Sequence, residues 1–401
     1  MKKILAIVLA FAMTLSLLSF ASAEGYSGDL KVWVAEAVVD FTNEQIAAFK
    51  EAHPEYANMN VTVEAVGEGD AAGKVITDVE SAADIFGFAQ DQLGRLVQAG
   101  ALVEVEEENA KAVEAENDAG SVAAVKMGDV MYAYPMTSDN GYFLYYDKSV
   151  VTDPTDLDKI LEDCEKAGKN FYFEVNSGWY QVAFFFAHGC ELTYTTDSEG
   201  AYTGLNTTYA SDAGVAALKS MIKMAKSPAF QNGSSLSTAT NVGAIVDGVW
   251  DSSAAKDLFG ENYAATKLPM ADGVQLSGFG GFKMLGVKQQ TDDDKLAACD
   301  ALAAYLTSEE VQLARYKAHG WGPSNLAAQQ NEAVQADEAL SALAAQLAYD
   351  IPQGQYPGDY WSLATSLGDS VASGEIAADA SDEDLLKVLT DFQTTCESYA
   401  K

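Results

Sequence analysis

The segment that most constrains the fold is 84–105, where an apolar run, a polar break and a helical pattern follow one another. Residues 85–88 have the length and composition of a buried strand, and the apolar residues of 93–97 recur at helical spacing until Gly100. The polar residues 90–92 therefore lie just past the end of a strand, where ligands bind in open α/β sheets. The segment predicts a ligand-binding tip, by which we mean the polar residues at the end of this strand. The rest of the chain would support this tip and form the opposite side of the binding site.

The segments before this tip alternate between strand and helix patterns. Residues 30–34 and 59–66 are β-rich, and residues 41–52 and 71–82 have helical character. This alternation is typical of a parallel sheet with helices on its faces. Further strand patterns follow at 131–135, 142–146, 171–175, 242–250, 263–269 and 278–287. A polar tip is expected at 137–141, and a helix at 157–167 that ends at Gly168. Because no repeat or low-complexity linker interrupts the chain, we expect two α/β lobes joined by crossing strands.

The chain is strongly acidic, with a net charge of −35 from 24 Lys and Arg residues against 59 Asp and Glu residues. Such a surface repels phosphate backbones and anionic lipid heads, which disfavours nucleic acid and membrane surfaces as partners. The acids are spread along the chain, a pattern typical of a protein exposed to water outside a cell. With 401 residues and 48% hydrophobic residues, the chain is long and apolar enough for more than one domain.

Residues 1–23 have the three parts of an export signal: two lysines, an apolar run at 4–20 and Ala-Ser-Ala at 21–23. We expect cleavage near Glu24 and a mature protein that is periplasmic, secreted or retained at the cell surface. No cysteine follows the apolar run, so no lipoprotein anchor of the usual kind is predicted. No other window is long and apolar enough to span a bilayer.

The cysteines are sparse and give no motif. They are Cys164, Cys190, Cys299 and Cys396. Export permits disulfides and four cysteines allow three pairings, but domains of this size do not need them. Free, partly buried thiols are at least as good an expectation. Since no C-x-x-C motif occurs, neither a metal nor a cofactor is predicted.

Aromatic and carboxylate residues recur at the ends of the predicted strands. Aromatic rings stack on the apolar faces of sugar rings, while Asp, Asn and Glu accept hydrogen bonds from hydroxyl groups. Taken singly, each aromatic is better explained by core packing and each carboxylate by a helix cap or solvated turn. The repetition is what predicts a site for a neutral, hydroxyl-rich ligand. The candidates are Glu36, Phe88, Asp91, Asp139, Asn140, Asn176, Trp179, Tyr180, Trp250, Tyr360 and Trp361.

Catalytic patterns are weak. His53, His188 and His319 each lie at the end of a predicted helix, and the G-x-S-x-G, H-E-x-x-H and P-loop motifs are absent. Asp91 and Asp139 can face each other as the paired carboxylates of a glycoside hydrolase, but acids are so abundant that such a pair carries little weight. We therefore predict a binding protein, with an exported carbohydrate-active enzyme as the alternative.

Several segments resemble one family in their order and spacing. DIFGFAQDQLGRLVQAGALVEV (84–105) is similar to a strand, aromatic-Ala-His-Asp and Gln-x-Gly-Leu-Leu signature. MYAYPMTSDNGYFLYYDK (131–148) resembles G-K-x-Y-A-x-P … L-x-Y-N-K, and DGVWDS (247–252) resembles N-G-P-W. LPMADG at 268–273, the glycine-rich 278–281 and Ile351-Pro352-Gln353 before Trp361 follow in the expected order. Over nearly its whole mature length, the chain resembles the extracellular solute-binding proteins of carbohydrate ABC importers, of the group that includes the maltose/maltodextrin-binding proteins.

The resemblance implies a type II-like, two-lobed periplasmic-binding-protein fold, in which each lobe is a sheet flanked by helices. Residues 24–138 with 278–325 would form lobe 1, and residues 139–277 with 326–401 would form lobe 2. The expected crossing segments are 134–146 and 278–281. Such a protein, expected to be a monomer, closes on an oligosaccharide by hinge motion and delivers it to an ABC transporter permease. Maltose or a maltodextrin is the first choice of ligand, and a polyamine or an amino acid is the non-sugar alternative.

Matched position by position, the resemblance implies ligand contacts at Glu36, Phe88, Asp91, Asp139 or Asn140, Trp179, Trp250 and Trp361. Several contacts of the maltodextrin binders are replaced in this chain. No Lys accompanies Glu36, Phe88 stands in place of a Trp, and a Glu is missing near Ser177. Gln92 and Thr365 each stand in place of an Arg. The aromatic residues persist better than the charged ones, which leaves the exact sugar open.

Overall fold

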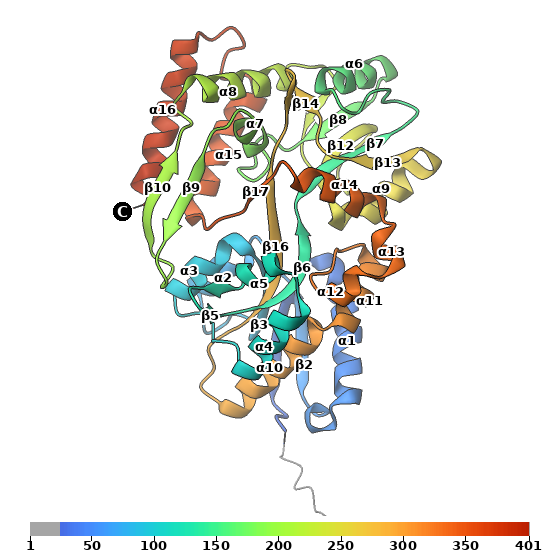
Figure 1. Cartoon of the computed structure of the whole chain (residues 1–401), viewed down its shortest axis with the longest axis vertical. Coiled ribbons are helices and arrows are strands. Elements are labelled where there is room, and N and C mark those ends of the chain that lie inside the picture. The colour runs from blue at the N-terminus through green and yellow to red at the C-terminus, as the bar shows by residue number, and fades with distance from the viewer. Residues whose placement is uncertain (1–24, 401) are drawn as a thin grey trace, which may run out of the picture.

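The computed structural model describes residues 25–400. The predicted export signal and its cleavage site lie outside these residues. The described chain forms two lobes stacked along the long axis, each built from a sheet flanked by helices (Figure 1). The predicted fold class is therefore confirmed.

The sheet of the first lobe is mixed. Its strands are β1 (Asp29–Val34), β2 (Asn60–Ala65), β3 (Ile85–Ala89), β6 (Tyr134–Asn140), β16 (Phe279–Val287) and β17 (Ile351–Pro352), in the order β17-β16-β3-β1-β2 with β6 also on β16. β1 runs parallel to β2 and β3, as the alternating pattern predicts, whereas β16 returns antiparallel to β3 and β6. β16 thus lies between strands that precede it by more than a hundred residues.

Helices cover both faces of this sheet. They are α1 (Val39–Ala52), α2 (Ala71–Thr77), α3 (Leu93–Gln98), α4 (Glu107–Glu116), α5 (Ala119–Ala124), α10 (Asp293–Leu306) and α11 (Glu309–His319). The short α12 (Leu326–Gln329) and α13 (Glu332–Gln335) follow α11 and lead into the second lobe. In α1, Phe41, Ile46 and Phe49 lie on one face at helical spacing and are buried. α2 ends at Thr77, five residues short of the prediction, and α3 leads to Gly100, whose φ of 62° suits glycine.

The sheet of the second lobe has the order β11-β8-β12-β7-β13. Its strands are β7 (Tyr142–Asp147), β8 (Asn170–Phe173), β11 (Phe230–Asn232), β12 (Val242–Gly248) and β13 (Tyr263–Thr266). The helices are α6 (Leu157–Ala167), α7 (Val182–Ala187), α8 (Asp212–Ala225), α9 (Ser252–Phe259), α14 (Glu338–Leu347), α15 (Gly358–Ala372) and α16 (Asp382–Ser398). α6 has the predicted bounds because Asp156 caps its first amides and Gly168 ends it in the left-handed conformation.

Strands cross between the lobes at two places in the sequence. β6 pairs in the first-lobe sheet and runs through Gly141 into β7 of the second-lobe sheet, while β16 begins beside β17 and ends in the first-lobe sheet. Residues 137–141, which the sequence suggests as a polar loop tip, are therefore mostly strand. The correction has a physical reason: β16 supplies backbone partners for Thr137 and Asn140, which satisfies polar groups that a loop exposes to water.

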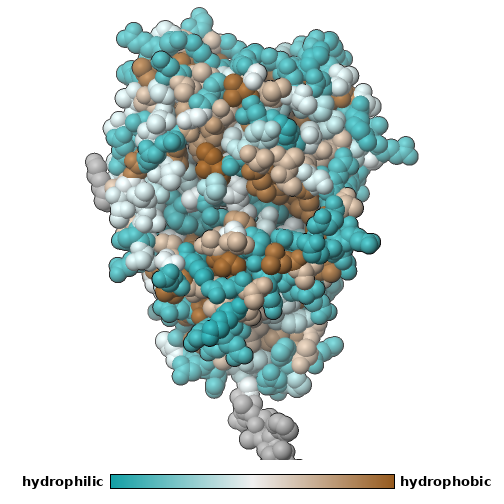
Figure 2. Space-filling model, viewed as in Figure 1, coloured by the Kyte–Doolittle hydropathy of each residue, from teal (hydrophilic) through white to brown (hydrophobic). Residues whose placement is uncertain are grey.

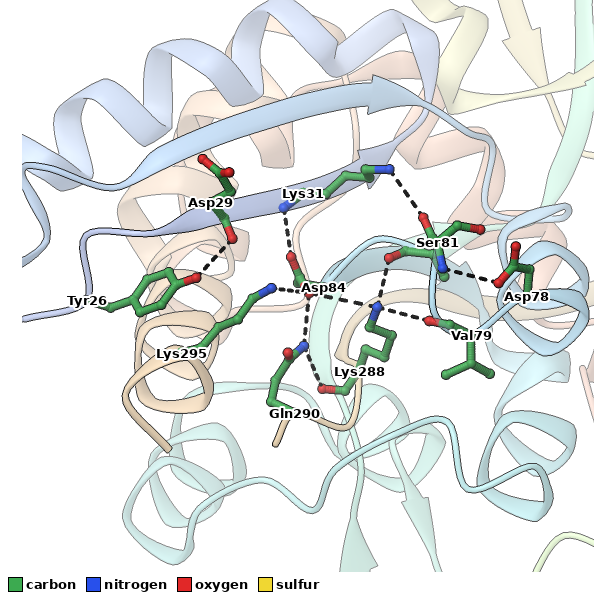
Figure 3. Close-up of polar contacts among 11 residues, drawn as sticks. Tyr26, Asp29, Lys31, Asp78, Val79, Ser81, Asp84, Lys288, Gln290 and Lys295 are labelled. Carbon is green, nitrogen blue, oxygen red and sulfur yellow. Dashed lines mark hydrogen bonds and ion pairs between the residues drawn. The ribbon is translucent and has the colours of Figure 1, made fainter. Parts of the chain in front are cut away.

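A buried ionic cluster, the Asp84 network, lies at the start of β3 (Figure 3). The carboxylate of Asp84 accepts hydrogen bonds from the Lys31 amide at 2.9 Å and from Gln290 Nε2 at 3.1 Å, and Lys295 Nζ lies 2.9 Å away. Lys288 Nζ is 3.9 Å from the same carboxylate and donates to the carbonyl oxygens of Val79 and Ala82. The one carboxylate and the two ammonium groups of this cluster thus have partners within the fold.

Two further properties bear on localisation and chemistry. The four cysteines are free and buried, which agrees with the free-thiol expectation. Within residues 25–400, no helix combines the length and the apolar character that crossing a bilayer requires. Figure 2 shows hydrophilic residues over most of the visible face, with apolar groups gathered near the waist between the lobes.

Candidate ligand-binding site

A cavity of about 580 Å³ lies between the two lobes. From the first lobe it is lined by Ala35 after β1, by Glu68 and Gly69 after β2, and by Asp91 and Gln92 after β3. These are the carboxyl ends of three parallel strands, which open on the same edge of the sheet. The predicted tip at 90–92 is a short 3₁₀ helix at this edge.

The second lobe lines the opposite side by the same geometry. Glu174 and Trp179 follow β8, Ser234 follows β11, and Trp250 and Asp251 follow β12. β8 runs parallel to both β11 and β12, so the carboxyl ends of these strands also meet at one edge. Two strand-end edges therefore face each other across the cavity.

Three predicted tryptophans meet in this cavity: Trp179, Trp250 and Trp361. The rings of Trp179 and Trp250 are 5.8 Å apart between centroids and tilted by 46°. The Trp179 indole N–H donates to Gln353 Oε1 at 3.2 Å, which fixes the ring orientation. Since indole faces stack on the C–H faces of sugars, the cavity has the apolar surfaces that a saccharide requires.

Asp91 and Asn140 are the predicted polar residues that reach the cavity. Asp91 is only 2% exposed, and its burial raises the pKa of the carboxyl to about 7, although the nearby Arg95 guanidinium acts in the opposite direction. Gln92 Nε2 donates to the Asp91 carboxylate, and Asn140 Nδ2 donates to Gln353 Oε1 at 3.3 Å. The Asp91 carboxyl thus sits in the wall of the cavity with little compensation.

Five predicted site residues lie elsewhere, and one of them, Asn176, donates from Nδ2 to Asp369 Oδ1 at 2.8 Å. Glu36 is exposed beside the cavity, whereas its neighbours Ala35 and Ala37 line it. Phe88 is fully buried in the first-lobe core, because β3 is a central strand covered on both faces. Asp139 is buried behind the cavity and accepts a hydrogen bond from the Gly322 amide at 2.5 Å. Tyr360 packs in the second-lobe core and donates to the Gly178 carbonyl.

Several lining residues are absent from the sequence prediction. They are Glu68, Asp70, Glu174, Ser234, Asp251, Lys283, Trp321 and Gln353, whereas Gln92 belongs to the predicted tip. Glu68 and Glu174 follow predicted strands, so a uniform use of the strand-end rule finds them. Lys283 lies inside a strand, and no signal in the sequence marks it. Tyr180, a weaker member of the tip set, also lines the cavity.

The cavity has polar atoms that find no partner in the described residues. Glu68 Oε1 and Gln92 Oε1 are acceptors without donors, and the indole N–H groups of Trp321 and Trp361 are donors without acceptors. Buried polar groups are normally satisfied, so these atoms indicate an occupant that both donates and accepts hydrogen bonds. Within residues 25–400, no cluster of His, Cys, Asp and Glu has the arrangement of a metal site.

Comparison with known proteins agrees with this architecture. The family described as bacterial extracellular solute-binding protein matches residues 44–342. A structure solved with acarbose is 29% identical, has a TM-score of 0.80, and the match covers 93% of this chain and 99% of that one. Among curated proteins, none matches by sequence.

Two further solved structures have the same fold. The maltodextrin-binding protein MalE1 from L. casei BL23, solved without ligand, is 25% identical with a TM-score of 0.74, over 94% of this chain and 100% of that one. The GacH receptor of Streptomyces glaucescens is 18% identical with a TM-score of 0.77 over the same shares, a likeness of fold alone. With a family match over most of its length and a ligand-sized cavity between two lobes, the chain belongs to the bacterial extracellular solute-binding proteins.

Proposed function

We propose that this protein is the extracytoplasmic binding component of a carbohydrate ABC importer and binds a neutral oligosaccharide between its lobes. One observation carries the proposal: four indoles share a cavity with hydrogen-bond donors and acceptors that have no partners among the described residues. A saccharide has apolar ring faces for the former and hydroxyl groups for the latter. A maltodextrin is the favoured ligand, since related structures are titled as maltodextrin-binding or acarbose-bound.

Transport requires binding and release, which a hinge supplies. We infer that residues 24–138 with 278–325 move as one lobe and residues 139–277 with 326–401 as the other. The hydrophobic cores support this division, because one core contains residues between Leu30 and Met136 and between Met284 and Trp321, while two others begin at Tyr142 and Phe143. Closure brings Asp91 of the first lobe and Trp179 of the second onto one ligand.

In this proposal the protein acts as an exported monomer, periplasmic or at the cell surface, that hands its ligand to a membrane permease and breaks no bond. The cavity carboxylates act as hydrogen-bond acceptors for hydroxyl groups. Glycoside hydrolysis requires one carboxylic acid to donate a proton to the leaving oxygen while a second carboxylate activates water or attacks the sugar. The test for this alternative is product formation after incubation with each sugar.

Isothermal titration of the purified mature protein against maltotriose, cellobiose, xylobiose, glucose and spermidine tests the proposal. We expect saturable binding of maltotriose at 1:1 stoichiometry, weaker binding of the other sugars and none of spermidine. Chromatography of the same samples should show every sugar unchanged. Silence towards all the sugars, or tighter binding of spermidine, would contradict the proposal.

A further inference from the structure

Lys283 is a buried amine in the floor of the cavity that the sequence does not mark. It lies on β16, opposite Ala89 of β3 on one side and Thr137 of β6 on the other. Side chains alternate along a strand, so Lys283 faces the cavity while its neighbour Phe282 lines a separate hollow behind the crossing strands. Its position at the end of β3 places it beside the predicted tip.

Two indoles surround the ammonium group. Lys283 Nζ lies 4.6 Å from the ring centroid of Trp250 and 4.3 Å from that of Trp321. Both distances are within the range of a cation–π contact. Trp321 belongs to the first-lobe core, whereas Trp250 follows β12 of the second lobe. The charge of Lys283 therefore lies where the two lobes meet across the cavity.

The ammonium group has no hydrogen-bond acceptor among residues 25–400, and no carboxylate of these residues lies within 4.0 Å, while the residue is only 6% exposed. Asp139 lies behind it and accepts from the Gly322 amide through one oxygen; burial raises the pKa of this carboxyl, and the charge of Lys283 acts in the opposite direction. Lys288, which directly follows β16, differs from Lys283 because its Nζ donates to two carbonyl oxygens and lies near Asp84. An ammonium group has three N–H donors, and those of Lys283 are available to an acceptor that enters the cavity.

We propose that Lys283, whose ammonium group lies beside Trp250 and Trp321, contacts the ligand. The ammonium group donates hydrogen bonds to an oxygen atom of the saccharide. This inference rests on the proposed function and adds a requirement to it: the ligand places a hydroxyl, ring or glycosidic oxygen at this point. The two rings position the ammonium, and the saccharide supplies the acceptor that the protein lacks.

The surrounding charges select a neutral acceptor over a carboxylate. Five acids line the cavity, and Lys283 is the one basic residue that does so within the described chain. The acids are Glu68, Asp70, Asp91, Glu174 and Asp251. The combined field of these acids opposes an anionic ligand. A uronic acid would therefore be attracted by Lys283 but repelled by several carboxylates. The oxygen that Lys283 recognises is therefore expected to belong to an uncharged sugar.

The test compares Lys283→Met and Lys283→Gln with the wild-type protein. Met keeps the length and apolar stem of lysine but removes the donors and the charge, while Gln keeps a neutral N–H donor. Lys267→Met is the matched control, because Lys267 Nζ lies 4.4 Å from the ring centroid of Tyr349, away from the cavity. Each protein is titrated with maltotriose and with a trigalacturonate, and the unfolding midpoint of the unliganded protein is measured.

We expect Lys283→Met to bind maltotriose about tenfold or more weakly and Lys283→Gln to lie between it and the wild type. The unliganded Lys283→Met protein should unfold at a temperature close to that of the wild type, since Met keeps the apolar stem that packs beside Trp250 and Trp321. Lys267→Met should bind like the wild type, and trigalacturonate should bind more weakly than maltotriose to the wild-type protein.

Three results would overturn the inference. Unchanged maltotriose affinity in Lys283→Met means that the ammonium does not contact the ligand. A parallel loss of affinity and of unfolding temperature means that Lys283 only supports Trp250 and Trp321. Tighter binding of trigalacturonate overturns the neutral acceptor. Silence of the wild-type protein towards every sugar overturns the proposed function and this inference together. The first two results leave the proposed function intact, whereas the third leaves its importer role but replaces its neutral ligand.

Discussion

Two carboxylates at opposite ends of β3 have nearly the same burial and opposite surroundings. Asp84, before the strand, is 5% exposed and is contacted by Lys295, Gln290 and the Lys31 amide, with Lys288 beyond. Asp91, after the strand, is 2% exposed and accepts a side-chain hydrogen bond from Gln92 alone among the described residues. Burial raises the pKa of Asp91 to about 7.

The difference separates stability from function along one strand. At its amino end the fold supplies every counter-charge that a buried carboxylate needs, which yields a rigid junction between β1, β3 and α10. At its carboxyl end the fold leaves a carboxyl group under-compensated beside a cavity. In the proposed function, this carboxyl accepts further hydrogen bonds from a ligand that enters the cavity, and that gain would contribute to affinity rather than to folding.

The largest expected effect tests the amino end of the strand. Asp84→Ala should lower the free energy of unfolding by about 3 to 5 kcal/mol, because it leaves the buried Lys288 and the nearby Lys295 without their anion. Urea unfolding measures the change. Asp78→Ala is the control in the same region, since Asp78 is exposed and accepts a hydrogen bond from the Ser81 amide at the surface, and it should lower the free energy of unfolding far less. Equal losses in the two variants would remove the contrast.

The next effect extends the contrast to tryptophan. Trp179→Ala should weaken maltotriose binding by about 2 kcal/mol, since it removes an aromatic surface from the cavity. Trp33→Phe should lower stability and leave the affinity of the folded protein unchanged, because Trp33 is buried in the first-lobe core and donates to Glu64 at 2.8 Å. Calorimetric titration and urea unfolding of both variants check the prediction. The prediction would be wrong if Trp33→Phe lost affinity for maltotriose while Trp179→Ala did not.

A smaller effect tests the carboxyl end of the strand. In Asp91 the folded pKa lies above the unfolded value, so this group makes the protein less stable as pH rises from about 4 to about 7, and no further above that. Asp91→Asn removes this titrating carboxyl group and its contribution to the pH dependence of stability. The variant should therefore be more stable than the wild type by about 1 kcal/mol or more at pH 8, with a difference near zero at pH 4. Other buried acids are present in both proteins and cancel in this difference.

The smallest expected effect concerns binding rather than folding. The carboxylate form of Asp91 is a stronger acceptor for sugar hydroxyl groups than the protonated form. Maltotriose affinity should therefore rise about two- to threefold between pH 6 and pH 8 in the wild type. Titrations of Asp91→Asn over the same range should be flat. An equal slope in both proteins would assign the pH dependence to another group.

Local patterns were sufficient for much of the fold. The bounds of α6 follow from a capping Asp and a terminating Gly, and β1, β2 and β3 follow from short apolar runs in an alternating pattern. Residues 137–141 were mispredicted because their strand depends on β16, which lies far along the chain. The local sequence does not indicate that β16 pairs with this segment, and polar residues in an extended segment resemble a loop.

The candidate site divides in the same way. Trp179, Trp250 and Asp91 follow strands whose ends are visible in the sequence, and all three line the cavity. Phe88 does not line the cavity, because its side chain points into the first-lobe core. Neighbouring residues of a strand face opposite sides of the sheet, so the strand pattern alone does not say which residue faces the ligand. Lys283 requires knowledge of which strands flank β16 and which indoles converge on it.

The place of β16 in the first-lobe sheet also sets an order of folding. β16 pairs with β3 and with β6, and most of the second lobe lies between these strands in sequence. Until the ribosome has released the chain as far as Val287, the first lobe lacks a central strand, and pairings across such distances form slowly. For an exported protein, this delay favours passage through the membrane before the first lobe can become compact.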